Sequence, residues 1–384
     1  MSYNVLLSAG NSFCPYIKHS MIITPKTTGR AFFFRKKWLV IFTVFLALAG
    51  GMYFYQAFGS GNVFKRNSSG LTSNGKDTVV NKDSLISEAP ATLDTAKYDK
   101  LLLALNNGDS SGRWPVKLQY PLPGAIFPFY RVVAYYGNFY SKKMGVLGEY
   151  PTDTMFRKLQ AEVKKWEAAD SSVPVRPALH YIAVTAQGYP GKGDKYRLRM
   201  PFKQIDSVIR MAARINALVF LDIQVGMSTV QEEVPMLEPY LKMPQVHLGI
   251  DPEFSMKTGK KPGSVIGTMN DSDINFTIKY LSNLVKANQL PPKILVVHRF
   301  TQAMIRNYKA IKPNPQVQVV VDMDGWGAKE RKLTTYREYV SKEPVQFTGF
   351  KLFYKNDYRE ENSSMMTPAE VLKLKPKPVY IQYQ

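Results

Sequence analysis

The feature that most constrains this chain is a regular alternation of short β-type runs with amphipathic helical segments from residue 131 to residue 383. The β-type runs, rich in β-branched and aromatic residues, are Arg131–Tyr136, Ala178–Thr185, Ala217–Gln224, Val246–Asp251, Lys293–His298, Val317–Asp322, Gly349–Tyr354 and Val379–Tyr383. Between them, apolar residues recur at helical spacing in 152–168, 202–216 and 273–288, and Thr367-Pro368-Ala369-Glu370 has the form of a capping box at a helix start. This alternation predicts parallel strands connected by helices.

Eight such units predict an α/β fold of the (β/α)8, or TIM-barrel, type. A doubly wound open sheet is the competing fold. It is disfavoured because Gly137-Asn138, and not a glycine-rich G-x-G-x-x-G turn, follows the first strand. We expect residues 99–130 to cap the bottom of the barrel or to lead into its first strand.

An apolar segment near the N-terminus predicts a membrane span. Residues 38–58 are long enough to cross a bilayer, and Arg35, Lys36 and Lys37 precede them. The positive-inside tendency then places residues 1–37 in the cytoplasm and the rest outside, which predicts a single-pass signal anchor in a bacterial inner membrane with a periplasmic or extracellular barrel. A cleaved signal peptide ending near Ala47-Leu48-Ala49 is the alternative. Either way the bulk of the chain is exported.

Residues 59–97 are rich in Ser, Gly and Asn and poor in aromatic residues, which predicts a disordered linker. The predicted organisation is therefore a basic cytoplasmic tail (1–37), a transmembrane anchor (38–58), a linker (59–97) and a TIM-barrel domain (98–384).

Composition limits the partners. The formal net charge of +21 would fit a nucleic-acid binder, but residues 1–76 hold nine Lys and Arg and no Asp or Glu, so much of the excess belongs to the membrane-proximal segment. We therefore expect a lipid bilayer and no nucleic acid as partner. Cys14 is the single cysteine, which excludes an intramolecular disulfide framework and a cysteine-based zinc cluster.

Polar residues close the predicted strands, at the end where active sites of such barrels lie. They are Asp222 and Gln224, Asp251 and Glu253, His298, Asp322 and Asp324, Lys351, and Gln382 with Tyr383. Strand alternation puts the two members of each Asp222/Gln224, Asp251/Glu253 and Asp322/Asp324 pair on one face. Asp after a strand also commonly caps a turn, so single carboxylates carry little weight. His180 and His247 lie earlier in their strands, and we expect them to be packed in the core.

Paired carboxylates of this kind indicate glycoside hydrolysis, in which one acid keeps its proton and its partner stays ionised. We predict Glu253 as the general acid, Asp251 as its partner, and Asp322 as a third catalytic residue. The predicted substrate-binding residues, aromatic side chains for stacking on sugar rings and polar ones for hydroxyls, are Tyr136, Asp222, Gln224, His298, Asp324, Trp326, Lys351 and Tyr383.

The D-x-E of Asp251-Pro252-Glu253 at the end of the fourth strand resembles the arrangement in family 18 chitinases and in Chalaropsis-type lysozymes, which implies a barrel enzyme acting on N-acetylated glycans. The longer chitinase signature D-x-x-D-x-D-x-E is not met, because Val246 and Gly249 stand at its first two Asp positions, and no Asp closes the first strand. The series RVVAYYG, LDIQ, GIDPEF, VVHRF, VVDMDGWG and GFKLFY also resembles exported bacterial barrel proteins, which bears on the fold more than on activity.

Two other functions stay open. One is a metal-dependent hydrolase or isomerase with Mg²⁺ or Mn²⁺ held by Asp222, Glu253, His298 and Asp322. The other is a catalytically inactive glycan-binding barrel, which would keep the aromatic residues but need no matched carboxylates. The leading hypothesis needs no cofactor and no metal.

Overall fold

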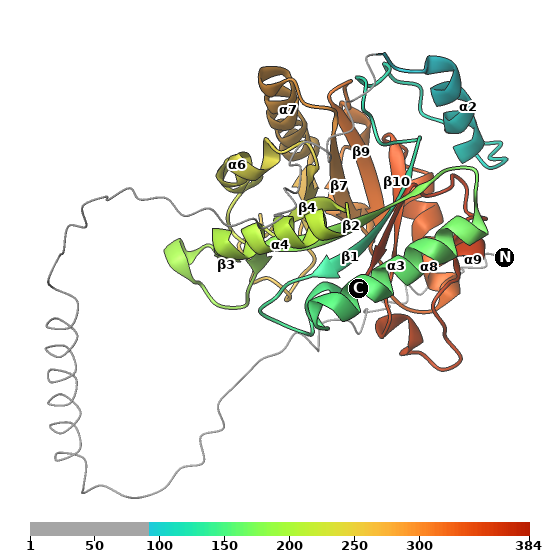
Figure 1. Ribbon diagram of the computed structural model, residues 1–384. Coiled ribbons are helices and arrows are strands. Elements are labelled where there is room, and N and C mark those ends of the chain that lie inside the picture. The colour runs from blue at the N-terminus through green and yellow to red at the C-terminus, as the bar shows by residue number, and fades with distance from the viewer. Residues whose placement is uncertain (1–91) are drawn as a thin grey trace, which may run out of the picture. The chain divides into compact units, whose positions relative to one another are not determined.

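The computed structural model describes residues 92–384, in which eight parallel strands close into a barrel (Figure 1). The first strand pairs both with the second and with the last, which closes the sheet. In order around the barrel the strands are β1 (Arg131–Gly137), β2 (Val175–Ala186), β4 (Leu218–Ile223), β5 (Val246–Ile250), β7 (Lys293–Arg299), β9 (Val317–Met323), β10 (Phe347–Leu352) and β11 (Tyr380–Tyr383). Each overlaps one predicted run, so the predicted α/β barrel is confirmed and the open sheet is wrong.

Three short strands were not predicted. β3 (Arg197–Arg199) pairs antiparallel with the end of β2, and β6 (Met269–Asn270) pairs with β8 (Ile305–Arg306) in a separate two-stranded sheet. These strands are only two or three residues long, too short to show a periodicity in the sequence.

Helices pack around the outside of the strands, as Figure 1 shows for α3, α4 and α7. The α-helices are α2 (Thr95–Leu105), α3 (Thr152–Ala169), α4 (Phe202–Arg214), α5 (Val230–Glu233), α6 (Glu238–Leu241), α7 (Asp271–Asn288), α8 (Lys329–Thr335) and α9 (Pro368–Val371), and a π-helical segment, Tyr336–Ser341, continues α8. The three long predicted helices are confirmed. The predicted capping box at Thr367 is also present, but α9 is a single turn, and Pro376 and Pro378 follow close behind it.

The lower end of the barrel, where the strands begin, is closed by the segment before β1. Phe127 is fully buried among inward-facing apolar side chains of the strands, including Phe347, Val320 and Leu218. The Gln318 side chain accepts hydrogen bonds from the backbone N–H groups of Ile126 and Phe127 and donates one to the Phe127 carbonyl oxygen. The expected capping role of this segment is therefore confirmed.

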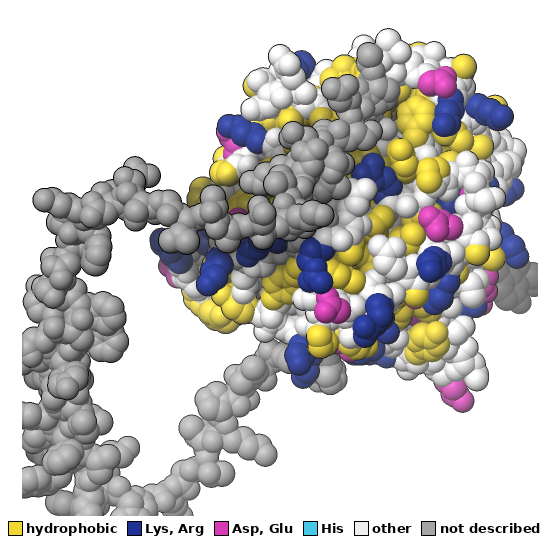
Figure 2. Space-filling view, in the orientation of Figure 1, with side chains coloured by type: hydrophobic (Ala, Val, Ile, Leu, Met, Phe, Trp, Pro, Cys, Tyr) yellow, Lys and Arg dark blue, Asp and Glu magenta, His cyan; other side chains and the backbone are white. Residues whose placement is uncertain are grey.

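The predicted cytoplasmic tail and membrane span lie outside the described residues, as does most of the predicted linker. Helix α2 begins at Thr95, inside the last residues assigned to that linker. Among residues 92–384, no helix has both the length and the apolar character needed to cross a membrane. On the face of the barrel seen in Figure 2, Lys and Arg side chains are spread among hydrophobic and uncharged ones.

Candidate active site

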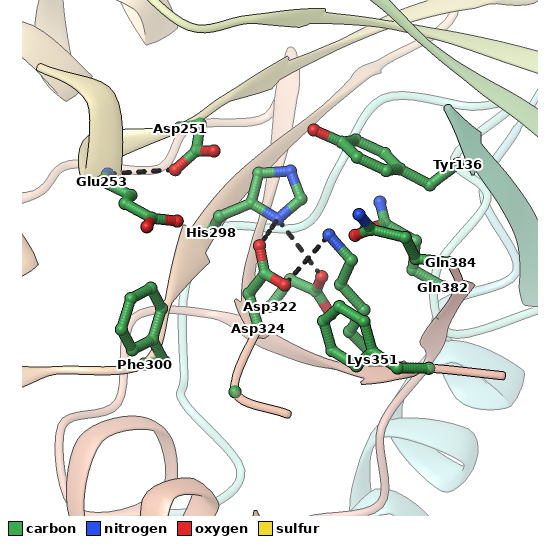
Figure 3. A network of polar contacts seen from close by, with 12 residues as sticks. Tyr136, Asp251, Glu253, His298, Phe300, Asp322, Asp324, Lys351, Gln382 and Gln384 are labelled. Atoms are coloured by element: carbon green, nitrogen blue, oxygen red, sulfur yellow. Dashed lines mark hydrogen bonds and ion pairs between the residues drawn. The ribbon is translucent and has the colours of Figure 1, made fainter. Parts of the chain in front are cut away.

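The pleat of the barrel strands brings a cluster of polar side chains together at the upper end, where the strands finish (Figure 3). On β1, for example, Val132 and Ala134 pack inside the barrel while Val133 and Tyr135 pack outward against the helices. The other strands alternate in the same way, except that β2 has an irregularity between Ile182 and Val184. The inward polar side chains at this end are Tyr136, His180, Asp222, His298, Asp322, Lys351 and Gln382, with Gln224, Asp251, Glu253 and Asp324 just beyond the ends of their strands.

His298 lies at the centre of the cluster, fully buried, and contacts three carboxylates. Its Nε2 is 3.3 Å from Asp222 Oδ1, and its Nδ1 is 3.2 Å from Asp324 Oδ2 and 3.5 Å from Asp322 Oδ2. Burial opposes protonation of His298, but the three carboxylates outweigh it and raise the pKa of the imidazole well above its ordinary value. His298 is therefore positively charged at neutral pH.

Asp222 lies between two histidines. Its Oδ1 is 3.3 Å from His180 Nε2 as well as from His298 Nε2, and its Oδ2 accepts a hydrogen bond of 2.9 Å from the Tyr136 hydroxyl. Burial disfavours the ionised carboxylate, but the charge of His298 and the contacts from both imidazoles hold the pKa of Asp222 well below its usual range. His180 differs from His298, because burial lowers its pKa to about 4 and leaves it neutral.

Asp322 is fully buried, and neither of its carboxylate oxygens has a hydrogen-bond partner among the described residues. Burial raises the pKa of Asp322, and His298 opposes that shift. A Cβ at Gly349 of the neighbouring strand would stand 2.5 Å from Asp322 Oδ1, so a glycine is required beside this carboxylate. Asp322 thus lies beneath the other acids, where it can influence His298 but is not accessible to a ligand.

Asp324 is the accessible member of the Asp322/Asp324 pair. Its Oδ1 is 2.9 Å from Lys351 Nζ, and the ammonium group also lies 3.9 Å from the centre of the Tyr136 ring. Burial opposes ionisation of Asp324, but Lys351 and then His298 outweigh it and lower the pKa of the carboxyl group. Asp324 is therefore an ionised carboxylate at the mouth of the barrel.

Asp251 and Glu253 lie in a 3₁₀ turn, Pro252–Phe254, and not on one extended strand as the sequence indicated. β5 ends at Ile250, and Asp251 Oδ1 accepts a hydrogen bond of 3.0 Å from the Glu253 backbone N–H. Burial raises the pKa of Asp251 to about 7, opposed by His298 and reinforced by Asp222. Burial, then the charges of Asp251 and Asp324, raise the pKa of Glu253 to about 8. Near neutral pH Glu253 thus keeps its proton, Asp251 titrates, and Asp324 is ionised.

The structure brings together most of the predicted site residues but not all. Tyr136 and Gln224 join the cluster, since the Gln224 amide donates a hydrogen bond of 3.3 Å to the Tyr136 hydroxyl. Trp326 lies partly exposed in the loop after β9, with the Arg359 guanidinium 5.4 Å from its ring centre.

Tyr383 lies outside the cluster, contrary to the prediction. It faces the helix layer, where its hydroxyl accepts a hydrogen bond of 3.0 Å from Trp166 Nε1 and its ring stacks on Tyr354. The physical reason is the two-residue period of a strand, because Gln382 points into the barrel and its neighbour must then point out.

Sequence reasoning missed His180 and Tyr380 as members of the cluster, and it named Gln382 at a strand end without assigning it a role. His180 Nδ1 is 2.6 Å from the Tyr380 hydroxyl and 3.0 Å from Gln382 Nε2. His180 is buried, as expected. Its hydrogen-bonded partners at the upper end of the barrel were not predicted. Strand β2 extends to Ala186, with an irregularity between Ile182 and Val184, so counting back from the strand end misplaced its level in the barrel.

A metal ion would find ligands in one group of this cluster. Among the described residues, the ligand atoms of His180, Asp222 and His298 all lie within 4.8 Å of one another. The set that the metal hypothesis named included Glu253 and Asp322 and omitted His180, and it does not form such a group in the part of the chain that the structure describes.

Comparisons with known proteins leave the activity open. No protein-family model and no curated protein matches the chain. One similar solved structure is a hyperthermophilic endo-β-1,4-glucanase in complex with substrate, at 9% identity over 54% of this chain and 77% of that chain, with a TM-score of 0.29. Another is GH26C from Muricauda sp. MAR_2010_75, at 11% identity over 75% and 82%, with a TM-score of 0.29. We base no functional argument on likenesses at this level, and the resemblance to family 18 chitinases and Chalaropsis-type lysozymes stays a prediction.

Proposed function

We propose that this barrel is a glycoside-hydrolase-like protein that acts on a glycan, with Glu253 as general acid. One observation carries the proposal. At one end of the barrel, Glu253 is held protonated near neutral pH while Asp324 is held ionised, and the two are close enough for the charge of Asp324 to raise the pKa of Glu253. An acid and an ionised partner with separated pKa values are what glycosidic bond cleavage requires.

Glu253 suits the acid role by its position. Its side chain is partly exposed, whereas Asp251 is 3% exposed and Asp322 is fully buried. A pKa of about 8 keeps the proton on Glu253 until a leaving oxygen approaches. Asp251 supports this state in two ways, because its carboxyl group fixes the turn that carries Glu253 and its negative charge, when present, raises the pKa of Glu253.

Asp324 is the better candidate for the ionised partner, in place of Asp251, and for the third catalytic role, in place of Asp322. Lys351 and His298 stabilise its negative charge, and it lies nearer the surface than Asp322. Such a carboxylate would stabilise positive charge that develops on the sugar ring or orient the group that attacks it. Asp322 then acts through His298 as a positioning residue.

The substrate we propose is a cell-envelope or extracellular glycan. This choice rests on the predicted export of everything after residue 58 and on the predicted anchoring of the chain through residues 38–58. Partly exposed aromatic side chains, Phe300 beside Glu253 in Figure 3 and Trp326 in the next loop, offer faces on which sugar rings can stack.

The test is hydrolysis of N-acetylglucosamine oligomers and of a panel of envelope and extracellular polysaccharides by the full chain and by Glu253→Gln. Glutamine keeps the shape and removes the proton, so we expect turnover to fall by ~10² to 10⁴ with binding nearly intact. Glu330→Gln, an exposed acid on α8, is the matched control and should keep full turnover.

Two results would contradict the proposal. If Glu253→Gln turns over glycans as fast as the wild type, Glu253 is not the general acid. Binding of glycans by the wild type without any cleavage would instead support the inactive glycan-binding barrel.

A further inference from the structure

We propose that His180, Asp222 and His298 form a binding site for one divalent transition-metal ion of the zinc class. This inference stands apart from the proposed hydrolase function, because it rests on residues below Asp251 and Glu253 and its test uses no glycan. All three side chains are fully buried inside the barrel.

The spacing of the ligand atoms matches a tetrahedral metal site. His180 Nε2 and His298 Nε2 each lie 3.3 Å from Asp222 Oδ1. Ligands bound at about 2.0 to 2.1 Å from a tetrahedral zinc ion are separated by about 3.3 to 3.4 Å, which follows from the geometry of the tetrahedron. Two of the three separations therefore match a tetrahedral site, and the ligand atoms of all three residues lie within 4.8 Å of one another, within reach of one shared ion once the side chains adjust.

Gly249 leaves space beside two of these ligand atoms, Asp222 Oδ1 and His180 Nε2. A Cβ at this position would stand 2.4 Å from Asp222 Oδ1 and 2.5 Å from His180 Nε2. Those distances are only a few tenths of an ångström longer than metal–ligand bonds. Any other residue in place of Gly249 would fill this space with its own Cβ.

Outer partners hold both imidazoles with Nε2 directed at Asp222. His180 Nδ1 lies 2.6 Å from the Tyr380 hydroxyl, and His298 Nδ1 faces Asp322 and Asp324. Metal-binding histidines typically have the second ring nitrogen engaged by a carboxylate, a carbonyl or another polar group, which fixes the ring. This arrangement points both Nε2 atoms at the shared centre, where each would bind a metal ion after losing its proton.

The polar groups here are incompletely satisfied by one another. His298 Nε2 has no well-aligned hydrogen-bond partner among the described residues, and neither oxygen of Asp322 has one. A metal ion bound here would engage His298 Nε2, and any proton on that nitrogen would be released to solvent. Two imidazoles and one carboxylate favour Zn²⁺ or Co²⁺ over Mg²⁺.

The experiment uses the full chain, purified from cells grown with added Zn²⁺ and, separately, Co²⁺. We expect about one ion per chain by mass spectrometry of the metal content, and a visible spectrum of tetrahedral Co²⁺. Asp222→Asn and His298→Gln should weaken metal binding by about 100-fold or more. Removing a residue that only supports a ligand typically costs about 10- to 100-fold in metal affinity, and removing a ligand itself should cost at least as much.

His247→Gln is the matched control. His247 is also buried inside the barrel, but its Nδ1 accepts a hydrogen bond from the Ile294 backbone N–H at a lower level, so this variant should keep the ion. Folding of each variant is checked by circular dichroism. If the ligand variants do not fold, X-ray absorption of the zinc-loaded wild type decides, since it must show two imidazole ligands.

Three results would overturn the inference. They are a folded wild type without bound metal, an octahedral Co²⁺ spectrum, and equal metal content in wild type, Asp222→Asn and His298→Gln.

Discussion

The two ends of the barrel interior treat their buried polar groups differently. At the lower end, the Gln318 side chain satisfies the backbone N–H groups of Ile126 and Phe127 and the Phe127 carbonyl oxygen, and His247 Nδ1 accepts a hydrogen bond from the Ile294 backbone N–H. Both side chains thus have backbone partners, and of their side-chain N and O atoms only His247 Nε2 lacks one among the described residues. This end is built for stability.

At the upper end, charged groups face one another and several lack well-aligned partners. Asp322 is the clearest case, fully buried without a hydrogen bond on either oxygen. Such groups cost stability, so a fold that keeps them gains something else in return. The comparison teaches that the lower ends of the eight strands stabilise the fold, whereas their upper ends hold the reactive side chains.

The largest expected effect on stability is at the lower end. Phe127→Ala removes a fully buried ring that packs on Phe347, with ring centres 5.5 Å apart, and should lower the free energy of unfolding by ~3 to 5 kcal/mol. Urea denaturation measures this change, with Leu103→Ala at an exposed position of α2 as control. A loss as small as that of the control would mean that the segment before β1 does not close the barrel.

A smaller effect is expected at the upper end from Gly349→Ala. Its Cβ would press on Asp322 Oδ1 at 2.5 Å and on the Tyr380 ring at 3.1 Å, which should cost ~1 to 3 kcal/mol of unfolding free energy. Gly188→Ala, with nothing within 4 Å of the added atom, is the control. An increase in stability, again measured by urea denaturation, would show that the upper end has space for an added methyl group. It would weaken the contrast drawn between the two ends of the barrel.

The smallest effect, taken per pH unit, is a pH dependence that belongs to the upper end. The folded chain keeps the Glu253 proton up to pH about 8, whereas the unfolded chain loses it near 4.5. The folded state therefore binds more protons between these values, and stability falls as pH rises, by at most about 1.4 kcal/mol per pH unit from this group. Glu253→Gln should flatten that slope between pH 5 and 8 and Glu330→Gln should not. Equal slopes in urea denaturation series of wild type and Glu253→Gln would refute the raised pKa.

The sequence predicted the polar cluster better than the geometry within it. Strand ends are visible as apolar runs closed by polar residues, so Asp222, His298 and Lys351 could be assigned to one end of the barrel. The turn at Asp251 and Glu253 could not be predicted, because Pro252 is compatible with both an extended strand and a 3₁₀ turn. The separate depths of Asp322 and Asp324 follow from where β9 ends, which the periodicity leaves uncertain by a residue or two.

By itself, the sequence determined the eight barrel strands, their order, the long helices and the end of the barrel where charged residues collect, because these depend on local patterns of side chains. Only the tertiary structure decided which residues share a level. That choice depends on how far each strand is staggered against the next when the barrel closes, a property of the whole sheet. Closure brought His180 to Asp222 and His298, and the pleat of β11 turned Tyr383 outward against Trp166.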